Sequence, residues 1–364
     1  MDRARSEPKF NYVPNVAQAP EGFRLAERGS ESARGVLFGL VTGYRLTQAL
    51  YVTARLGIAD RLSGGPRGVD DLAREVGAHP DRLLRVLRVL AAHGVFTLDG
   101  RRRVGLTPVG EYLRTDVPGS LAAFATFSGA EPYHAFEDLF HTVNTGETAF
   151  NHAYGKGHFE YLAQHPEASA TFQRAMAGAI ESAGDPLEGF DFGNHRVLVD
   201  VGGGHGALLA AVLHAHDGLR GILYDLENAV VDAPAFLESA GLKDRCEIQT
   251  GSAFESVPSG GDLYVMSRIL HDWPDEQALT LLRNCRKVVP DHGALLLREV
   301  VLAEGIPPPA RAELDLMMMA ITGGRERTQQ EWRELLHQAG FVLRRVWMNR
   351  AGQDLIEAGP DSSS

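Results

Sequence analysis

The chain has only two cysteines among its 364 residues, Cys246 and Cys285. Two thiols cannot form a disulfide framework, and no Cys/His spacing typical of a metal site occurs, so we expect neither a disulfide-rich secreted protein nor a bound metal. No apolar run approaches the roughly 20 residues that span a bilayer. The opening MDRARSEPKF also lacks the apolar core of a signal peptide. We therefore expect a cytoplasmic protein that does not contact membranes.

Positively charged residues are also fewer than negatively charged ones. Lys and Arg number 36 against 47 Asp and Glu, which gives a formal net charge of −11. This balance disfavours a protein whose whole surface binds nucleic acid or anionic lipid. Hydrophobic residues make up 44% and charged residues 23%, as in ordinary globular proteins. A chain of this length is long for one core, so more than one domain is expected.

The first part of the chain, residues 31–115, has helical periodicity that ends in a hairpin. Helices are predicted at 49–62, 69–77 and 79–96, and Asp99-Gly100 between two short extended runs is typical of a hairpin. Three helices followed by a hairpin form a winged-helix pattern. The residues before this segment, 1–30, are predicted to be a disordered tail.

A winged helix has two common uses, DNA binding and subunit packing. Arg101, Arg102 and Arg103 stand at the wing, and segment 55–115 holds eleven Arg against seven Asp or Glu. This excess is modest beside the number of phosphate contacts that DNA binding recruits. We favour subunit packing and expect no nucleic-acid partner, with a ligand-sensing DNA-binding regulator as the alternative.

The rest of the chain changes character twice. Residues 116–185 are helical and rich in Phe, Tyr, His and Met, which predicts a connector that lines a small-molecule pocket. Residues 186–364 alternate strands with helices, which predicts an α/β fold with a parallel, doubly wound sheet and a nucleotide-like ligand at the carboxyl ends of its strands. Strands are predicted at 196–201, 220–225, 245–250, 262–270, 293–302, 342–349 and 353–358, and helices at 206–216, 228–240, 274–289, 310–321 and 329–339.

A glycine turn, VDVGGGHGA, follows the first of these strands. Gly202, Gly204 and Gly206 allow a tight turn and a close approach of the backbone to a ligand. Counted with Ala207, they satisfy the dinucleotide fingerprint, so an NAD enzyme is one alternative. We favour S-adenosylmethionine, because Asp200 at the strand end suits a cationic amino-acid group, and because hydride transfer requires neither HDW nor GGRERT.

Four motifs together resemble one family. VLVDVGGGHG, YDLENAV, RILHDWPDEQALTLLRNCRKVV and GGRERTQQEWRELLHQAGF occur in the order found in S-adenosylmethionine-dependent O-methyltransferases of the caffeic acid and hydroxyindole type. The closest resemblance is to the bacterial branch that modifies polyketides and phenazines. It implies a C-terminal doubly wound, Rossmann-like methyltransferase domain and an all-helical, winged-helix-like N-terminal dimerisation domain. It also implies a homodimer, an aromatic small-molecule acceptor, S-adenosyl-L-homocysteine as product, and no metal.

The resemblance assigns roles to individual residues. His271 matches the general base that removes a proton from the acceptor hydroxyl, and Glu299 and Glu326 match the two acids that orient it. The predicted cofactor contacts are Asp200, Gly202, Gly204, Asp225, Leu226, Ser252, Ala253, Phe254, Ser267 and Arg268. Ser252 departs from the family pattern, which has Asp at the adenine contact, so this contact loses a charge.

Several predictions keep a structural alternative. Phe172, Met176, Asp272, Met317, Met318 and Ile321 are predicted to line the acceptor pocket, although the methionines equally suit ordinary core packing. His271 or Asp272 would otherwise cap the following helix. Glu299 and Glu326 would otherwise be surface partners of Arg298, Arg325 or Arg327. A family member with a different reaction, such as hydroxylation or ring chemistry, is the remaining functional alternative.

Overall fold

The computed structural model describes residues 33–361 apart from 182–184, 194 and 351. The predicted tail at residues 1–30 lies outside the described residues. Among the helices that the structure describes, none is both long enough and apolar enough to cross a membrane.

The chain divides into two compact units between Arg45 and Leu46. In the first unit the structure describes α1 (Ala33–Thr42), a helix without a buried residue. The next helix, α2 (Tyr44–Arg55), begins just before this division. Everything that follows belongs to the second unit.

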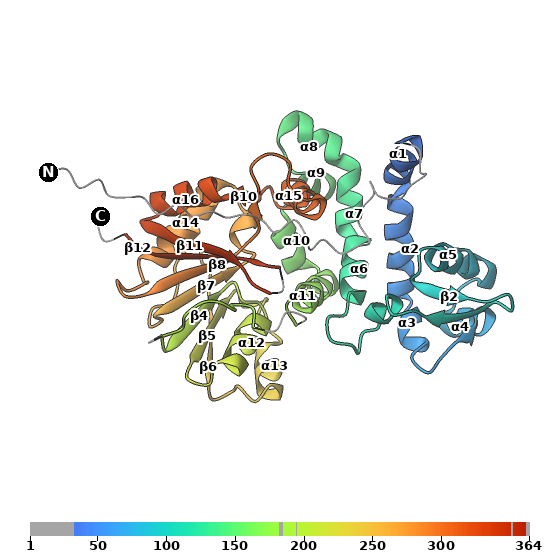
Figure 1. Ribbon diagram of the computed structural model, residues 1–364, viewed down its shortest axis with the longest axis horizontal. Helices are drawn as coiled ribbons and strands as arrows, with labels where there is room; N and C mark the ends of the chain where they lie inside the picture. The colour runs from blue at the N-terminus through green and yellow to red at the C-terminus, as the bar shows by residue number, and fades with distance from the viewer. Residues whose placement is uncertain (1–32, 182–184, 194, 351, 362–364) are drawn as a thin grey trace. The chain divides into compact units, whose positions relative to one another are not determined.

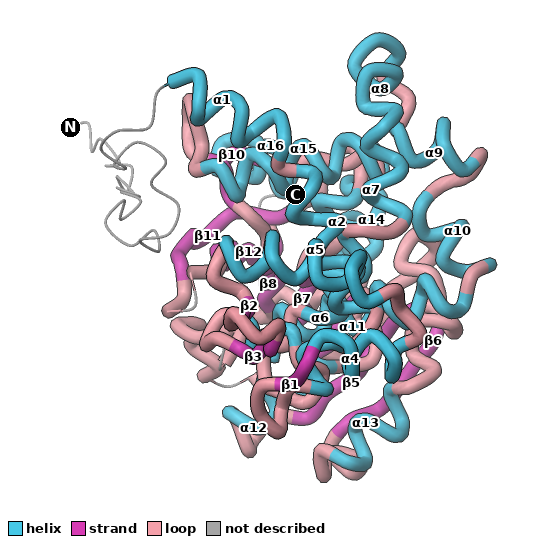
Figure 2. The backbone as a smooth tube through the Cα atoms, turned by 90° about the vertical axis from the view of Figure 1, so that its right-hand side faces the viewer, coloured by secondary structure: helices cyan, strands magenta, loops and turns pink. Residues whose placement is uncertain are grey.

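The second unit begins with the winged-helix pattern. Its helices after α2 are α3 (Ile58–Arg61), α4 (Val69–Val76) and α5 (Pro80–Ala92). Its strands are β1 (Arg67–Gly68), β2 (Phe96–Leu98) and β3 (Arg103–Leu106), which form an antiparallel sheet in the order β1-β3-β2 (Figure 2). The predicted hairpin is confirmed. The region is not all-helical as predicted, because it also contains this small sheet.

Local chemistry explains the turn of the hairpin and one break in a helix. Asp99 Oδ1 accepts hydrogen bonds from the backbone N–H groups of Arg101 and Arg103, at 2.9 and 2.8 Å, which closes the turn. The predicted helix 49–62 is interrupted at Gly57, whose φ of 58° lies in the left-handed region. Arg102 forms ion pairs with Asp70 and Asp81, each at 3.1 Å, so this wing arginine is engaged within the module.

Short helices make up the connector. After η2 (Gly110–Leu113), which precedes the connector, they are α6 (Ala122–Ser128), α7 (Glu131–Ala135), η3 (Phe136–Asp138), α8 (Leu139–Thr145), α9 (Ala149–Tyr154), α10 (His158–Gln164) and α11 (Pro166–Glu181). The helical stretch predicted at 158–181 is two helices, because Pro166 begins a new helix rather than continuing α10. Among its described residues the connector has helices and no strand, as predicted.

The C-terminal part is a seven-stranded sheet in the order β11-β12-β8-β7-β4-β5-β6 (Figure 1). Its strands are β4 (Val197–Val201), β5 (Arg220–Asp225), β6 (Cys246–Thr250), β7 (Leu263–Ser267), β8 (Ala294–Arg298), β11 (Phe341–Met348) and β12 (Asp354–Pro360). Five strands are parallel, but β12 pairs antiparallel with both β8 and β11. The expectation of a wholly parallel sheet is therefore wrong at this edge, because the short connection after Met348 can join only antiparallel strands.

Helices cover both faces of the sheet, as the doubly wound prediction requires (Figure 1). One core joins the sheet to α12 (Ala207–Ala215) and α13 (Ala233–Ser239). The other joins it to α14 (Asp275–Arg286) and α16 (Gln329–Gln338). The chain leaves β4 towards β5 on one side, whereas β7 lies on the other side of β4. This reversal marks the carboxyl edge of β4 and β7 as the expected ligand site.

Two predicted strands are shorter in the structure, and both differences affect the site. The strand predicted at 262–270 ends at Ser267, and a short 3₁₀ helix, η4 (Leu270–Asp272), follows it. The strand predicted at 293–302 is split into β8 and β9 (Val301–Leu302). The helix α15 (Pro309–Ile321) then leads to β10 (Arg327–Thr328), which pairs parallel with β9.

Candidate active site

The glycine turn between β4 and α12 has the backbone that its sequence predicts. Gly202, Gly204 and Gly206 have φ values of 78°, 58° and 92°, in the left-handed region where side chains with a Cβ are strained. Space is also restricted, since a Cβ on Gly202 would lie 2.5 Å from Ile269 Cδ1. The Gly202 N–H donates to the Tyr224 carbonyl at 2.8 Å, which ties the turn to the end of β5.

Two aspartates lie against this turn, and among the residues described only one of them has hydrogen bonds to it. Asp225, which ends β5, accepts hydrogen bonds from the N–H groups of Gly204 at 2.8 Å and Leu226 at 2.7 Å. Asp200 lies beneath the turn, where a Cβ on Gly203 would be 2.6 Å from its Cγ. Asp200 is 1% exposed, and its Oδ2 has no hydrogen-bond partner within the described chain. Burial raises the pKa of Asp200 to about 7, and the Asp225 charge adds to this effect.

The loop after β6 forms a second wall beside this edge of the sheet. Ser252, Ala253 and Phe254 are half-buried there. The Asn284 side-chain amide donates to the carbonyls of Ala253 at 3.0 Å and Phe254 at 2.8 Å. The Phe254 ring lies edge-on to Trp273, with 4.7 Å between centroids. The buried Asn284 thus fixes the predicted adenine loop, a role that the sequence analysis missed because the residue lies on α14, about 30 residues further along the chain.

His271 lies just beyond β7, in η4, and its side chain is surrounded by carboxylates. Its Nδ1 is 2.7 Å from Glu326 Oε1 and 3.9 Å from Glu299 Oε2. Its Nε2 is 4.0 Å from Asp272 Oδ1. The structure therefore brings together the three residues predicted to act on the proton, with Asp272 as a fourth member of the group.

The backbone explains how the two glutamates reach the same histidine. Glu299 lies in the gap between β8 and β9, where its Oε1 accepts hydrogen bonds from the N–H groups of Ile269 at 3.0 Å and Leu270 at 2.9 Å. Glu326 immediately precedes β10, and the parallel pairing of β10 with β9 brings it beside Glu299. The Glu326 N–H donates to Asp315 Oδ1 at 2.8 Å, which anchors the loop to α15.

The structure contradicts the structural alternatives for these residues. The Glu299 and Glu326 side chains are fully buried, so they are not surface partners of arginines. Arg325 pairs instead with Glu331, and Arg327 with Asp275. Capping is wrong as well, because α14 begins after Pro274 without a side-chain cap from either His271 or Asp272.

The charges around His271 compete to set its pKa. Burial lowers the pKa, but the carboxylates of Glu299, Asp272 and Glu326 together outweigh burial and raise it to about 9. Burial raises the pKa of Asp272 to about 7, although the nearby histidine opposes this. Burial likewise raises the pKa of Glu299. His271, Asp272 and Glu299 therefore bind protons more readily than isolated side chains would, as expected of a site that moves protons.

Arg327 and Gly324 hold the histidine turn in place, and the sequence analysis missed both roles. The buried Arg327 guanidinium donates to the carbonyls of Leu270 at 3.0 Å and Trp273 at 2.9 Å, on either side of His271. A Cβ on Gly324 would lie 1.9 Å from the His271 carbonyl oxygen, so this loop packs directly on the turn. Both residues lie in the GGRERT motif, in which the sequence predicts a chemical role only for Glu326.

Ser267 is the last residue of β7, and Arg268 follows it, just before the histidine turn. The Ser267 hydroxyl accepts a hydrogen bond from Arg298 Nη1 at 3.0 Å. Arg298 is 2% exposed, and its Nη2 has no partner among the described residues. Arg268 has a φ of 55°, an uncommon conformation for a residue with a side chain, and strain of this kind clusters at functional sites.

The residues predicted for the acceptor pocket lie in two adjoining clusters. Phe172 on α11 packs its ring against Phe127 and His158, each with 5.5 Å between centroids. Met317 packs against the cluster that contains Phe150 and Ile321. The two clusters meet where the Phe150 and His158 rings lie 4.9 Å apart.

The remaining pocket candidates differ in burial. Met318 and Ile321 are buried, and Met176 and Met317 are half-buried. The consecutive Met317 and Met318 therefore differ in burial, as neighbouring residues on a helix do. Gln173, next to Phe172, lies beside the glycine turn, because a Cβ on Gly204 would be 2.9 Å from its Oε1. The connector thus lies against the predicted cofactor site.

The chain is similar to known proteins over most of its length. A family model described as an O-methyltransferase domain matches residues 136–342, and one described as an O-methyltransferase dimerisation domain matches residues 38–116. Phenazine O-methyltransferase PhzM of Lysobacter antibioticus is 40% identical over 333 residues, 91% of this chain and 98% of that protein. Other relatives, at 33% and 34% identity, are N-methyltransferases.

Solved structures show the same relationship. The crystal structure of LaPhzM has a TM-score of 0.88 and 41% identity, and the match covers 91% of this chain and all of that one. An O-methyltransferase from neocarzinostatin biosynthesis, solved with S-adenosyl-L-homocysteine and 1,4-dihydroxy-2-naphthoic acid, has a TM-score of 0.75 and 33% identity. That match covers 87% of this chain and 96% of the other.

Proposed function

The chain belongs to the S-adenosylmethionine-dependent O-methyltransferases, and on that premise we propose that it methylates a phenolic hydroxyl of an aromatic small molecule with His271 as the general base. Methylation of aromatic compounds in secondary metabolism is the activity that the family supports. The observation that carries the finer proposal is the buried hydrogen bond of 2.7 Å between His271 Nδ1 and Glu326 Oε1. It leaves Nε2 as the nitrogen available to the acceptor.

The residues at the glycine turn fit the methyl donor. The donor supplies a methyl group already activated on a sulfonium. An unpaired, buried Asp200 oxygen suits its cationic amino-acid end, and the Asp225 carboxylate suits ribose hydroxyls. We propose that Gly202 and Gly204 admit the donor closely, that Leu226, Ser252, Ala253 and Phe254 contact its adenosine, and that Ser267 and Arg268 contact its methionine end.

The chemistry explains why a base at this position is useful. A phenol has a pKa of about 10 and is largely protonated at neutral pH. Placing its oxygen in line with the methyl group is worth up to roughly 7–11 kcal/mol. His271 removes the proton as the oxygen–carbon bond forms, a contribution of typically 10²–10⁴-fold. Glu326 holds the Nδ1–H tautomer, and Glu299 stabilises the imidazolium that results.

The acceptor pocket is proposed from the two aromatic clusters, one of which reaches the histidine turn, where Phe159 stacks on Trp273 with 5.6 Å between centroids. Phe172, Met176 and Met317 offer flat or flexible apolar surface, which suits a planar aromatic acceptor. Met318, Ile321 and Asp272 complete the proposed wall. The relative that methylates phenazines and the one solved with a naphthoic acid act on or bind fused aromatic rings, which supports the same class here.

The wider organisation is proposed as follows. Residues 31–115 form the dimerisation domain, 116–185 the connector, and 186–364 the methyltransferase domain. The match of a dimerisation-domain model to residues 38–116 supports a homodimer. Cys246 and Cys285 are free thiols, which suits the reducing cytoplasm that we propose as its compartment.

Methyl transfer is tested directly by mass spectrometry. The full chain is incubated with S-adenosylmethionine and a panel of phenols, naphthols and hydroxyphenazines, and products are examined for one added methyl group. We expect an O-methyl ether from at least one fused-ring phenol. Methylation only of ring nitrogens or amines would overturn the proposed acceptor, and hydroxylated products without methyl gain would favour the alternative reaction.

The role of His271 needs a separate comparison. We expect His271→Gln to lower turnover by roughly 10²–10⁴-fold while S-adenosyl-L-homocysteine binds as before. His165→Gln is the matched control, because His165 is an exposed connector histidine that stacks on Tyr161. Unchanged turnover in His271→Gln would mean that the protein only positions its acceptor.

A further inference from the structure

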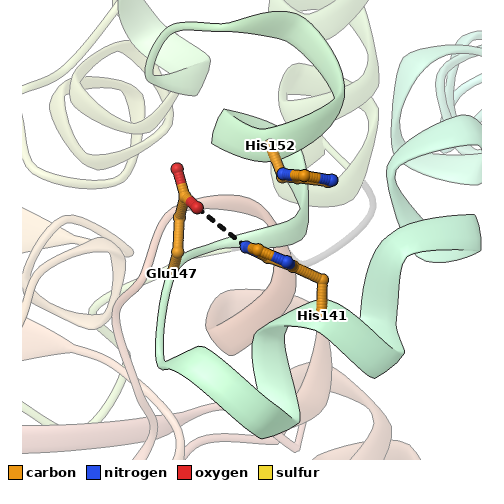
Figure 3. Close-up of side chains that lie close together, drawn as sticks. All are labelled: His141, Glu147 and His152. Atoms are coloured by element: carbon orange, nitrogen blue, oxygen red, sulfur yellow. Dashed lines mark hydrogen bonds and ion pairs between the residues drawn. The ribbon is translucent and has the colours of Figure 1, made fainter.

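Three side chains outside the methyl-transfer site meet where α8 turns into α9. His141 lies on α8, Glu147 in the turn and His152 on α9 (Figure 3). His141 Nε2 is 2.8 Å from Glu147 Oε2. The two imidazole rings are stacked, with 3.8 Å between centroids and 14° between planes. One donor atom from each residue lies within 4.8 Å of the other two.

The turn holds the three residues on a well-defined backbone. Gly146 closes α8 in the left-handed conformation, with its N–H donating to the Thr142 carbonyl. Thr148 caps α9 by accepting a hydrogen bond from the Asn151 N–H at 3.1 Å. The Glu147 N–H donates to the Thr145 hydroxyl at 3.1 Å. Both helix ends are thus capped around Glu147, so little backbone ordering is needed to bring the ligands together.

The donor set has a recognisable chemistry. Two imidazole nitrogens and one carboxylate oxygen are ligands that Zn²⁺ accepts, with a further position open to water. We propose that His141, Glu147 and His152 bind one divalent transition-metal ion, with Zn²⁺ as the best match. Glu147 and His152 are exposed and His141 is half-buried, so an ion reaches them without unfolding of the corner.

Binding requires small rearrangements that exposed side chains allow. Ligands of one tetrahedral zinc ion are about 3.3 Å apart at bond lengths of about 2.0–2.1 Å. The ion therefore replaces the hydrogen bond between His141 and Glu147, and these two side chains separate slightly. Lone pairs of stacked rings run parallel, so the exposed His152 ring turns to aim a nitrogen at the ion.

An ion at this corner would stabilise residues that support the wall of the proposed acceptor pocket. Next to the corner on α9, Phe150 is fully buried against Ile321 of α15. A Cβ on Gly323 would lie 3.0 Å from Thr148 Cγ2, so the start of α9 also packs near the loop that carries Glu326. Linking α8 to α9 through a metal would therefore stabilise the corner that supports both.

Affinity for Zn²⁺ is the first test. The full chain, without a histidine tag, competes for Zn²⁺ with a chromophoric chelator, alongside His152→Ala, Glu147→Gln and His134→Ala. Loss of an outer-shell partner already costs roughly 10–100-fold in affinity, so loss of a direct ligand in the first two variants should cost at least that. His134→Ala is the matched control, because exposed His134 lies 3.6 Å from Glu137 without a second imidazole in that pair.

The number of imidazoles on the ion is the second test. Pulsed electron paramagnetic resonance of the protein with one equivalent of Cu²⁺ should show two imidazole nitrogens in the wild type and in His134→Ala, and one in His152→Ala. The buried group of His271, Glu299 and Glu326 has a single imidazole, so it cannot give the wild-type signal. A wild-type count of one, or equal Zn²⁺ affinity in all four proteins, would overturn the proposal.

Discussion

His271 must be neutral to accept a proton, yet three carboxylates around it favour its charged form. Their charges raise its pKa to about 9 against the opposing effect of burial. A cationic donor bound beside the ring opposes the carboxylates and should lower this pKa again. The free enzyme and the ternary complex should therefore titrate differently.

This difference gives a pH prediction for catalysis. The rise with pH of kcat/KM for the methyl donor reports the enzyme without bound donor, so we expect its midpoint near pH 9. The rise of kcat reports the bound complex, and its midpoint should lie lower. Steady-state rates between pH 6 and 10 check this, with an acceptor whose own pKa lies outside that range. Coincident midpoints would show that donor charge does not act on the histidine.

The same pKa has a consequence for stability. A histidine whose pKa rises from 6.5 unfolded to about 9 folded stabilises the protein fully below pH 6.5. This stabilisation is lost as the pH rises through 9. Denaturant unfolding should therefore show the wild type losing free energy of unfolding between pH 6.5 and 9 more steeply than His271→Gln. Parallel curves for the two proteins would contradict the shift.

Asp200 allows a second test of how the burial of a single ionisable residue affects stability. Its pKa is raised from 3.8 to about 7, so the folded state loses stability as the pH rises from about 4 to 7, and this loss is complete above pH 7. We expect Asp200→Asn to raise the free energy of unfolding by about 1–3 kcal/mol at pH 8 and to change it little near pH 4. The proposed donor contact predicts weaker S-adenosyl-L-homocysteine binding in the same variant. Asp217→Asn, on a fully exposed side chain, is the control.

At the scale of elements, the position of the histidine depends on a turn that another segment holds. η4 has three residues, so it cannot fix the His271 ring by itself. Arg327 binds the carbonyls on both sides of the histidine and also pairs with Asp275 at 2.8 Å. Its guanidinium lies over the Trp332 ring, 5.1 Å from the centroid. A single buried cation therefore joins η4, α14 and α16.

Lysine cannot reproduce that set of contacts, because its ammonium lacks the planar fork of donors. We expect Arg327→Lys to lower kcat by roughly 10–100-fold through misplacement of His271, with KM for the methyl donor nearly unchanged. Arg325→Lys is the matched control, since Arg325 is exposed two residues away and pairs with Glu331. Equal kcat in both variants would limit Arg327 to a structural role.

Elements of regular periodicity were predicted well, and interruptions were not. The strands β4, β5 and β6 fall within one residue of their predicted ends, because alternation and turns bound them clearly. The split between β8 and β9 at Glu299 could not be predicted from the apolar sequence around it. It accompanies the hydrogen bonds that Glu299 accepts from the N–H groups of Ile269 and Leu270. The strand predicted at 353–358 is present as β12, but its antiparallel direction was missed because alternation alone does not give strand direction.

At the scale of the whole molecule, the order of the motifs identified the site residues, but not the residues that hold them in place. The predicted His271, Glu299 and Glu326 do meet, although they are separated by up to 55 residues. Asn284, Arg327 and Gly324 were missed because each acts on backbone atoms of a segment distant in sequence. Such contacts depend on packing, and a single sequence shows packing only through residue type.

The final prediction concerns assembly. α1 is apolar, and Leu37, Phe38, Leu40 and Val41 are each more than 60% exposed. A contiguous apolar surface on a helix without buried residues indicates an interaction site. The dimerisation-domain match begins on the same helix, at residue 38. We therefore expect α1 to form part of the proposed homodimer interface.

Charge placed on that surface should separate the subunits. We expect Leu40→Glu to shift the protein from dimer to monomer in light scattering, and to remove any rise of Tm with protein concentration. Ile306→Glu is the control, because Ile306 is 97% exposed but lies outside the dimerisation-domain match. If Leu40→Glu stays dimeric at micromolar concentration, the subunits associate through another surface, and the apolar face of α1 requires a different partner.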